Sequence, residues 1–186
     1  MIDHDLLLVG AGPAHLGVLR RWALIERPAG RIALVAGAEH TWHAGMLPGL
    51  VGGRYSPQDC QIGLSALCQA AQVELIVAPV AALDAATRQL TLADGRVLQG
   101  NWLSLNVGDQ VACPPREGEG MDVLAVKPVD QFISGWQAWQ RDPQPLAILG
   151  GGVAGGEMAL ALADQVPQLA LFCGCLLYTS PSPRDS

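Results

Sequence analysis

A glycine-rich turn near the start of the chain constrains its fold more than any other feature. The apolar run Leu6–Val9 leads into Gly10-Ala11-Gly12, and the residues from there to Arg27 keep their polar side chains on one side of a helical period. A short, continuous apolar run is typical of a parallel strand that is buried on both faces. The sequence therefore predicts a strand, a tight turn and a helix in residues 5–27.

The turn itself has the composition of a phosphate-binding loop. Gly10 can adopt the backbone angles of a tight turn, and Gly12 has no side chain to keep a phosphate away from the backbone. The start of the helix, at Ala14 and His15, presents unpaired N–H groups and a partial positive charge. His15 stands where the dinucleotide-binding fingerprint has its third glycine, so this turn alone is equally compatible with an α/β protein of another kind.

A second unit of the same kind lies near the other end of the chain. The apolar run Leu146–Leu149 precedes a turn in which all three glycine positions are filled, by Gly150, Gly152 and Gly155. A helical segment follows, as it does after the first turn. Two such units are far more specific than one, because each needs its own strand and helix. Two nucleotide sites in one chain suggest electron transfer between two cofactors.

The strand that follows the first helix, predicted at residues 31–35, completes a βαβ unit. In nucleotide-binding units the end of this strand usually carries an acid that binds the adenosine ribose. Here the first acid is Glu39, after Gly37 and Ala38. Glu39 is therefore a weak candidate for the ribose, and a solvated loop carboxylate is the alternative.

The sequence between the two glycine turns predicts an α/β fold. Helices are expected at residues 63–72 and 129–141, and strands at residues 73–77, 80–83, 89–92, 97–98, 102–107 and 123–126. Three of these strands are short and form an antiparallel β-meander inserted between parallel strands. Residues 40–56 are too rich in glycine for a regular helix, and we expect a functional loop there. The architecture is thus a Rossmann-like domain with an inserted meander, followed by the start of a second Rossmann-like domain.

Composition excludes several functions. Half of the 186 residues are hydrophobic, the formal net charge is −6, and lysine occurs once, as Lys127, so no basic stripe could follow a nucleic acid. The N-terminus is acidic where a secretory signal is basic, and no apolar run is long enough for a membrane span, so we expect a cytoplasmic protein. The five cysteines are irregularly spaced, which favours free buried thiols, and no metal site is expected.

The last residues differ from everything before them. Residues 175–186 resemble the translation of a sequencing-library adaptor, and their Ser-Pro-Ser-Pro follows the predicted strand 169–173 directly. We exclude them from the fold as an artefact, so that the second unit is expected to be cut after its second strand.

Several short motifs together carry a family resemblance. They are Ala14-His15 in the first turn, Met46-Leu47-Pro48-Gly49 in the loop, Leu105-Asn106-Val107-Gly108 and Val126-Lys127-Pro128-Val129. With both glycine turns, they make residues 5–173 resemble the two-dinucleotide flavoproteins of the pyridine nucleotide-disulfide oxidoreductase superfamily. The branch it resembles is related to type II NADH dehydrogenases and is also found fused to selenophosphate synthase.

The resemblance implies FAD on the first unit, NAD(P)H on the second, and hydride transfer from nicotinamide to flavin and on to a small acceptor such as a quinone. It implies an FAD-binding domain at residues 1–113, a linker strand and helix at 114–144, and a truncated NAD(P)-binding domain at 145–174. Any contact with a membrane would come only through a missing C-terminal part.

The resemblance also implies roles for individual residues. Gly10, Gly12, Ala14 and His15 are expected to bind the FAD pyrophosphate. Met46, Leu47 and Pro48 are expected to approach the isoalloxazine, and Gly108 is expected to lie along the flavin chain. Gly150, Gly152 and Gly155 would hold the NAD(P)H pyrophosphate. Glu157 matches a glutamate near the flavin–nicotinamide contact, with an exposed acid in the first helical turn as the alternative.

Two further expectations follow from the resemblance. The family's disulfide branch needs two cysteines four residues apart, whereas Cys60 and Cys68 are eight apart, so we reject a dithiol mechanism. The alternative to an enzyme is a regulatory module that senses flavin or nicotinamide redox state for a fused or partner selenophosphate synthase.

Overall fold

The computed structural model describes residues 3–109, 111 and 122–174. Cys113, Cys175, the predicted linker up to residue 121 and the tail 175–186 lie outside these residues. The described chain forms two compact units, one from residues 3–42 and 61–109 and the other from residues 43–60, 111 and 122–174. The predicted domain boundaries stay predictions.

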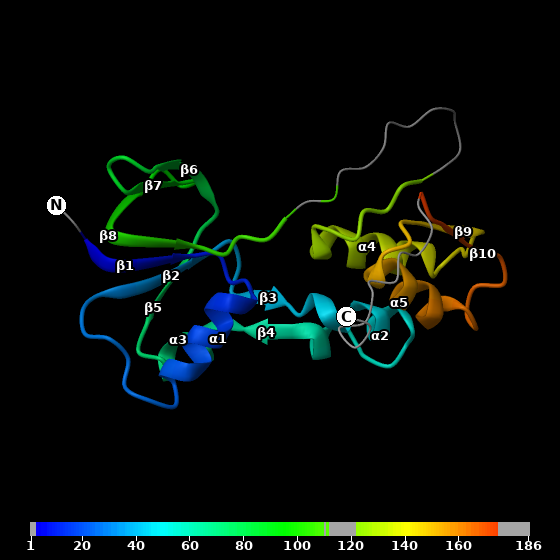
Figure 1. Ribbon diagram of the computed structural model, residues 1–186, viewed down its shortest axis with the longest axis horizontal. Coiled ribbons are helices and arrows are strands. Elements are labelled where there is room, and N and C mark those ends of the chain that lie inside the picture. The colour runs from blue at the N-terminus through cyan, green and yellow to red at the C-terminus, as the bar shows by residue number, and fades with distance from the viewer. Residues whose placement is uncertain (1–2, 110, 112–121, 175–186) are drawn as a thin grey trace, which may run out of the picture. The chain divides into compact units, whose positions relative to one another are not determined.

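The first unit is built on a mixed six-stranded sheet with the strand order β5-β2-β1-β8-β7-β6 (Figure 1). Its parallel part consists of β1 (His4–Val9), β2 (Ile32–Ala36), β5 (Glu74–Val77) and β8 (Val97–Leu105). The meander β6 (Val80–Asp84) and β7 (Gln89–Leu92) runs antiparallel into β8. The predicted α/β fold with an inserted meander is confirmed.

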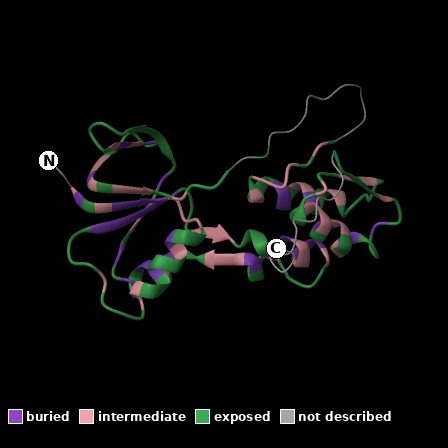
Figure 2. Cartoon of the chain, viewed as in Figure 1, coloured by how far each residue is buried: buried purple, intermediate pink, exposed green. Residues whose placement is uncertain are grey.

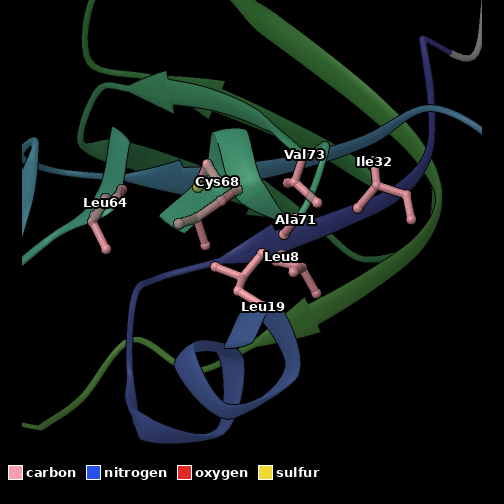
Figure 3. Close-up of a cluster of buried hydrophobic side chains, with 9 residues drawn as sticks. Leu8, Leu19, Ile32, Leu64, Cys68, Ala71 and Val73 are labelled. Atoms are coloured by element: carbon pink, nitrogen blue, oxygen red, sulfur yellow. The ribbon is translucent and has the colours of Figure 1, made fainter. Parts of the chain in front are cut away.

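Side chains of the central strands alternate between two hydrophobic layers, as the period of a strand requires. On one face, Leu8 of β1 and Leu34 of β2 pack against α1 (Pro13–Trp22) and α3 (Leu64–Ala70), as Figure 3 shows for this cluster. On the other face, Leu7 and Val35 pack against the meander residues Leu90 and Leu92. Figure 2 shows the buried residues concentrated along these strands. Burial on both faces explains why β1 and β2 are continuous apolar runs.

A two-stranded antiparallel ribbon leaves this sheet. It pairs β3 (His40–Trp42) with β4 (Gln61–Gly63), and His40 lies opposite Gly63. The ribbon carries the chain from the end of β2 to α3.

The second unit combines the chain's later elements with the loop of residues 43–60. Its helices and strands are η1 (Ala44–Met46), α2 (Leu47–Val51), η2 (Gln58–Cys60), α4 (Val129–Trp139), β9 (Leu146–Leu149), α5 (Val153–Leu162) and β10 (Leu169–Phe172). β9 and β10 pair in parallel, which confirms the predicted strand–helix–strand unit. α2 packs against α5, and its Leu47, Leu50 and Val51 are buried.

Several predicted elements differ from the structure. α1 ends at Trp22 and not at Arg27. Leu24 and Ile25 are exposed, and the backbone N–H groups of both donate to the carbonyl of Arg21. The two strands predicted at 97–98 and 102–107 are one strand, β8.

Two other differences concern the second unit. The predicted strand at 123–126 is wrong, since the sheet of this unit is formed by β9 and β10 and leaves that segment irregular. The prediction of no regular helix in residues 40–56 is wrong at α2, where three buried residues have helical spacing and Pro48 stands in the first turn, the helical position that tolerates proline.

Candidate functional site

The first glycine turn lies at the carboxyl ends of the parallel strands β1, β2 and β8. It follows β1 directly and is hydrogen-bonded to the ends of the other two. The N–H of Gly10 donates to the carbonyl of Val35 at the end of β2, at 2.8 Å. The N–H of Gly12 donates to the carbonyl of Asn106, just after β8, at 3.1 Å. Open α/β sheets bind ligands at this edge. The turn is therefore a fixed part of the sheet rather than a free loop.

Both glycines are required by protein neighbours. Gly10 has a φ of +87°, and a Cβ there would lie 2.7 Å from the Cα of Val107. A Cβ at Gly12 would overlap the side chain of Asn106. The prediction that Gly12 makes room for a phosphate stays a prediction, since the contact described here is that of an added Cβ with Asn106.

Asn106 caps the helix that follows the turn. Its Oδ1 accepts from the backbone N–H of Ala14 at 3.0 Å and of His15 at 3.5 Å. A backbone N–H can only donate, so the oxygen and not the nitrogen of the amide faces α1. Pro13 has no N–H, and that of Gly12 is already bonded to Asn106. One residue of β8's end thus satisfies the first-turn donors that the sequence assigned to a phosphate.

The side chain of His15 links the glycine turn to β8 by two hydrogen bonds. Its side chain is buried, with Nδ1 2.6 Å from the carbonyl oxygen of Gly10 and Nε2 2.9 Å from Oγ of Ser104. The carbonyl can only accept, so Nδ1 carries a proton, and in the neutral ring Nε2 accepts from the Ser104 hydroxyl. Where the fingerprint has a glycine for close packing, this chain has a hydrogen-bonded tether.

A cavity of about 320 Å³ opens beside the turn. It is lined by Gly10 and Ala11 of the turn, by residues 35–38, by His40 and Thr41 of β3, by residues 78–80 and by Val107. Its lining contains no carboxylate and no lysine or arginine. A larger cavity of about 760 Å³, beside Asp5, Pro28 and Trp102, lies toward the amino ends of the parallel strands, away from the edge where such sheets bind ligands.

Of the predicted residues of the first unit, Gly10 is in that lining, whereas Gly12, Ala14, His15, Glu39 and Gly108 lie outside it. Glu39 is exposed, and its backbone carbonyl accepts from Leu64 at the start of α3, at 2.9 Å. Gly108 is exposed with a φ of +85°, one residue beyond Val107.

The second glycine turn repeats the backbone of the first. Gly150 has a φ of +119° and donates its N–H to the carbonyl of Phe172 at 2.9 Å. Gly152 precedes α5 with φ −72° and ψ 178°, against −73° and 171° at Gly12 before α1. A Cβ at Gly155 would overlap the carbonyl oxygen of Gly150, so this glycine permits the close packing of helix and strand.

The remaining predicted residues also belong to the second unit. Met46 and Pro48 are half-buried and Leu47 is buried in the segment that packs on α5. Glu157 is exposed and is the fifth residue of α5. The alternative that it is an acid of the first helical turn is therefore wrong.

The described cysteines do not form a redox pair. Cys60 and Cys68 are buried and free, in different units, while Cys173 is free and exposed. Burial raises the pKa of both buried thiols, and the charge of Asp59 raises that of Cys60 further. Neither thiol is placed for thiolate chemistry.

Asn106 and Ser104 are site residues to which the sequence assigned no role, although Asn106 belongs to one of the motifs that carry the family resemblance. They are 92 and 89 residues from their partners Ala14 and His15, so no local pattern shows these contacts. Within the described residues, no group of His, Cys, Asp or Glu side chains could hold a metal ion. In the same part of the chain, no helix has the length and apolarity to cross a membrane.

Solved structures of similar fold include oxidoreductases and a reductase. The chain is similar to NADH:rubredoxin oxidoreductase from Clostridium acetobutylicum, with 18% identity, a TM-score of 0.71, and coverage of 90% of this chain and 44% of that one. The NAD-dependent persulfide reductase from A. fulgidus has 18% identity and a TM-score of 0.74, with coverage of 89% of this chain and 33% of that one. The sulfide:quinone oxidoreductase from Aquifex aeolicus has 16% identity and a TM-score of 0.64, with coverage of 88% of this chain and 41% of that one. The chain thus spans less than half the length of each.

No match is found among curated proteins. Residues 4–171 match the family described as pyridine nucleotide-disulphide oxidoreductase, which covers nearly all of the described chain and both glycine turns. By this match the chain belongs to the pyridine nucleotide-disulphide oxidoreductase family.

Proposed function

We propose that this chain supplies the FAD-binding part and the beginning of the NAD(P)H-binding part of an FAD-dependent NAD(P)H oxidoreductase. The observation that carries the proposal is the backbone form that the two turns share. Each has a glycine of positive φ at the strand end and a glycine of the same extended conformation before the helix. The family typically binds FAD and NAD(P), which matches two such sites in one chain.

The first turn fits the diphosphate of FAD in a particular way. The cavity beside it has the volume of a small ligand fragment and no negative side chain in its lining. Because Asn106 occupies the first-turn donors Ala14 and His15, we assign the diphosphate to the cavity beside Gly10 and Ala11 rather than to these donors. His15 acts as a positioning residue, since its imidazole is buried and bonded on both sides.

The second turn, with Gly150, Gly152 and Gly155, is proposed to bind NAD(P)H. When bound, the flavin supplies hydride acceptance from the nicotinamide. We keep Met46, Leu47, Pro48 and Gly108 as proposed flavin neighbours. Glu157 is kept as a proposed neighbour of the flavin–nicotinamide contact, because it is exposed on the helix that follows the second turn.

The electron acceptor is proposed to be a small molecule such as a quinone. Ala14-His15 and the Met46–Gly49 sequence support the branch related to type II NADH dehydrogenases. The absence of a close cysteine pair among the described thiols supports an acceptor that receives electrons from the flavin directly.

The test uses the full-length product of the gene that encodes this chain, with one charged substitution at each turn. Gly12→Glu would be ambiguous, because any side chain there overlaps Asn106. Ala11→Glu places a carboxylate in the cavity lining instead, and a Cβ at Gly152 meets no atom within 4 Å, so Gly152→Glu leaves the fold room.

We expect the unsubstituted protein to purify with flavin and to be bleached by NADH or NADPH. Ala11→Glu should lose the flavin through repulsion of the diphosphate. Gly152→Glu should keep the flavin and lose its reduction by nicotinamide. A protein that takes up no flavin, or a Gly152→Glu variant that is reduced as fast as the unsubstituted one, would contradict the proposal.

A further inference from the structure

We infer that His40, and not an acid, is the residue that selects the ribose of the adenosine diphosphate moiety bound at the first turn. The inference rests on the proposed function and concerns the cavity beside Gly10. Dinucleotide units place the adenosine ribose toward the end of their second strand, where a carboxylate usually accepts from its hydroxyls. In this chain that edge is formed by residues 35–38, which carry no polar side chain.

Glu39 does not take the acid's place. It is absent from the cavity lining, it is exposed, and its backbone is tied to α3 through the bond from the N–H of Leu64. A carboxylate with this exposure has water as a partner and gains little from a ribose hydroxyl.

Among the lining residues, only His40 and Thr41 have polar side chains. His40 is half-buried and held in β3 opposite Gly63, a residue with no side chain to compete for the space. The ring of Trp42 contacts it edge-on, with centroids 5.6 Å apart and planes at 87°. This packing restricts the rotation of the imidazole, so that less entropy is lost when a ligand binds.

An imidazole reads a ribose differently from a carboxylate. It can donate from one nitrogen and accept at the other, whereas a carboxylate only accepts. The imidazole also brings no negative charge toward the diphosphate. The cavity therefore suits an adenosine diphosphate with a free ribose, whose hydroxyls the imidazole recognises.

The experiment measures ribose discrimination in the full-length product of the gene. Binding of ADP, 2′-deoxy-ADP and 3′-deoxy-ADP to the flavin-free protein is followed by calorimetry, with Gly152→Glu present throughout to block the second turn. With His40 in place, this protein should bind ADP about three- to tenfold more tightly than at least one deoxy analogue, the value of one hydrogen bond. His40→Ala should lose this preference while keeping its affinity for the deoxy analogue.

Two further variants make the result decisive. Glu39→Gln tests the competing assignment and should keep the full preference. His40→Gln retains hydrogen-bonding capacity and should keep part of it, which separates ribose contact from damage to the fold. Unchanged discrimination in His40→Ala, its loss in Glu39→Gln, or ADP binding without discrimination would each overturn the inference. Failure of the unsubstituted protein to bind both ADP and FAD would instead overturn the proposed function.

Discussion

The side-chain oxygen of Asn106 lies 3.0 Å from the backbone nitrogen of Ala14, although the two residues are 92 positions apart. The contact joins the end of β8 to the start of α1, and the same residue accepts the N–H of Gly12 through its backbone. It therefore caps the first helix and also holds the glycine turn that lines the proposed diphosphate site. Substitutions of Asn106 can separate the two.

Asn106→Ala should lower the free energy of unfolding by about 1 kcal/mol, the usual cost of removing a helix cap. Asn106→Asp keeps an acceptor for Ala14 and places a negative charge at the positive end of α1, so stability should be preserved. The same charge repels a diphosphate, and flavin affinity should fall by at least about tenfold. Urea unfolding and fluorescence titration with FAD measure the two effects. Wild-type flavin affinity in Asn106→Asp would show that the diphosphate lies elsewhere.

His15→Gly restores the glycine of the fingerprint and should nevertheless destabilise the protein. It removes both hydrogen bonds of the buried imidazole and leaves the Gly10 carbonyl and the Ser104 hydroxyl without them. We expect a loss of about 2–3 kcal/mol in the free energy of unfolding.

Ser104→Ala removes one of those bonds and serves as the matched control, with an expected loss of about 1 kcal/mol. Since the two residues are direct partners, the double variant should lose less than the sum of the two single losses. Strict additivity in a urea-unfolding cycle would show that His15 and Ser104 do not interact.

The strand–turn–helix units could be predicted because their signals are local. A continuous apolar run, two or three glycines and a helical period are each contained in fewer than thirty consecutive residues, and both units are confirmed. The short helix α2 was missed because Gly49 suggested a loop, whereas burial of Leu47, Leu50 and Val51 outweighs the cost of that glycine.

The residues that contact the turn and line the cavity could not be predicted, because contacts between distant parts of the sequence bring them there. Asn106 and Ser104 face the turn only because β8 pairs with β1 in the register that sets Val9 beside Leu105. The sequence likewise offered Glu39 as the first acid after β2, with no sign that the ribbon β3–β4 would bring His40 and Thr41 to the cavity instead.

Gly10 and Gly108 form a matched pair for testing the close approach at the turn. Both have positive φ, +87° and +85°, but only Gly10 has backbone atoms where a Cβ would stand. Gly108→Ala should therefore lower the free energy of unfolding by about 1 kcal/mol, the cost of placing alanine in the left-handed conformation. Gly10→Ala should cost roughly 3 kcal/mol or more, because Val107 and Asn106 would have to move. Equal losses in urea unfolding would show that the end of β8 does not press on the turn.

The buried thiols should react far more slowly than the exposed one. In a background with Cys113 and Cys175 replaced by serine, Cys173 should be modified by a disulfide reagent at least about tenfold faster than Cys60 or Cys68, because burial hinders access and raises the pKa of both.

The raised pKa of the two buried thiols also predicts how stability depends on pH. Because their pKa in the folded state lies above the usual value of 9.0, the folded protein binds more protons near that pH than the unfolded protein does. The free energy of unfolding should therefore fall as the pH rises through about 9, and Cys60→Ala with Cys68→Ala should flatten that slope. Rapid labelling of Cys60 or Cys68 without urea would instead mark these thiols as accessible and reopen a role for them in electron transfer.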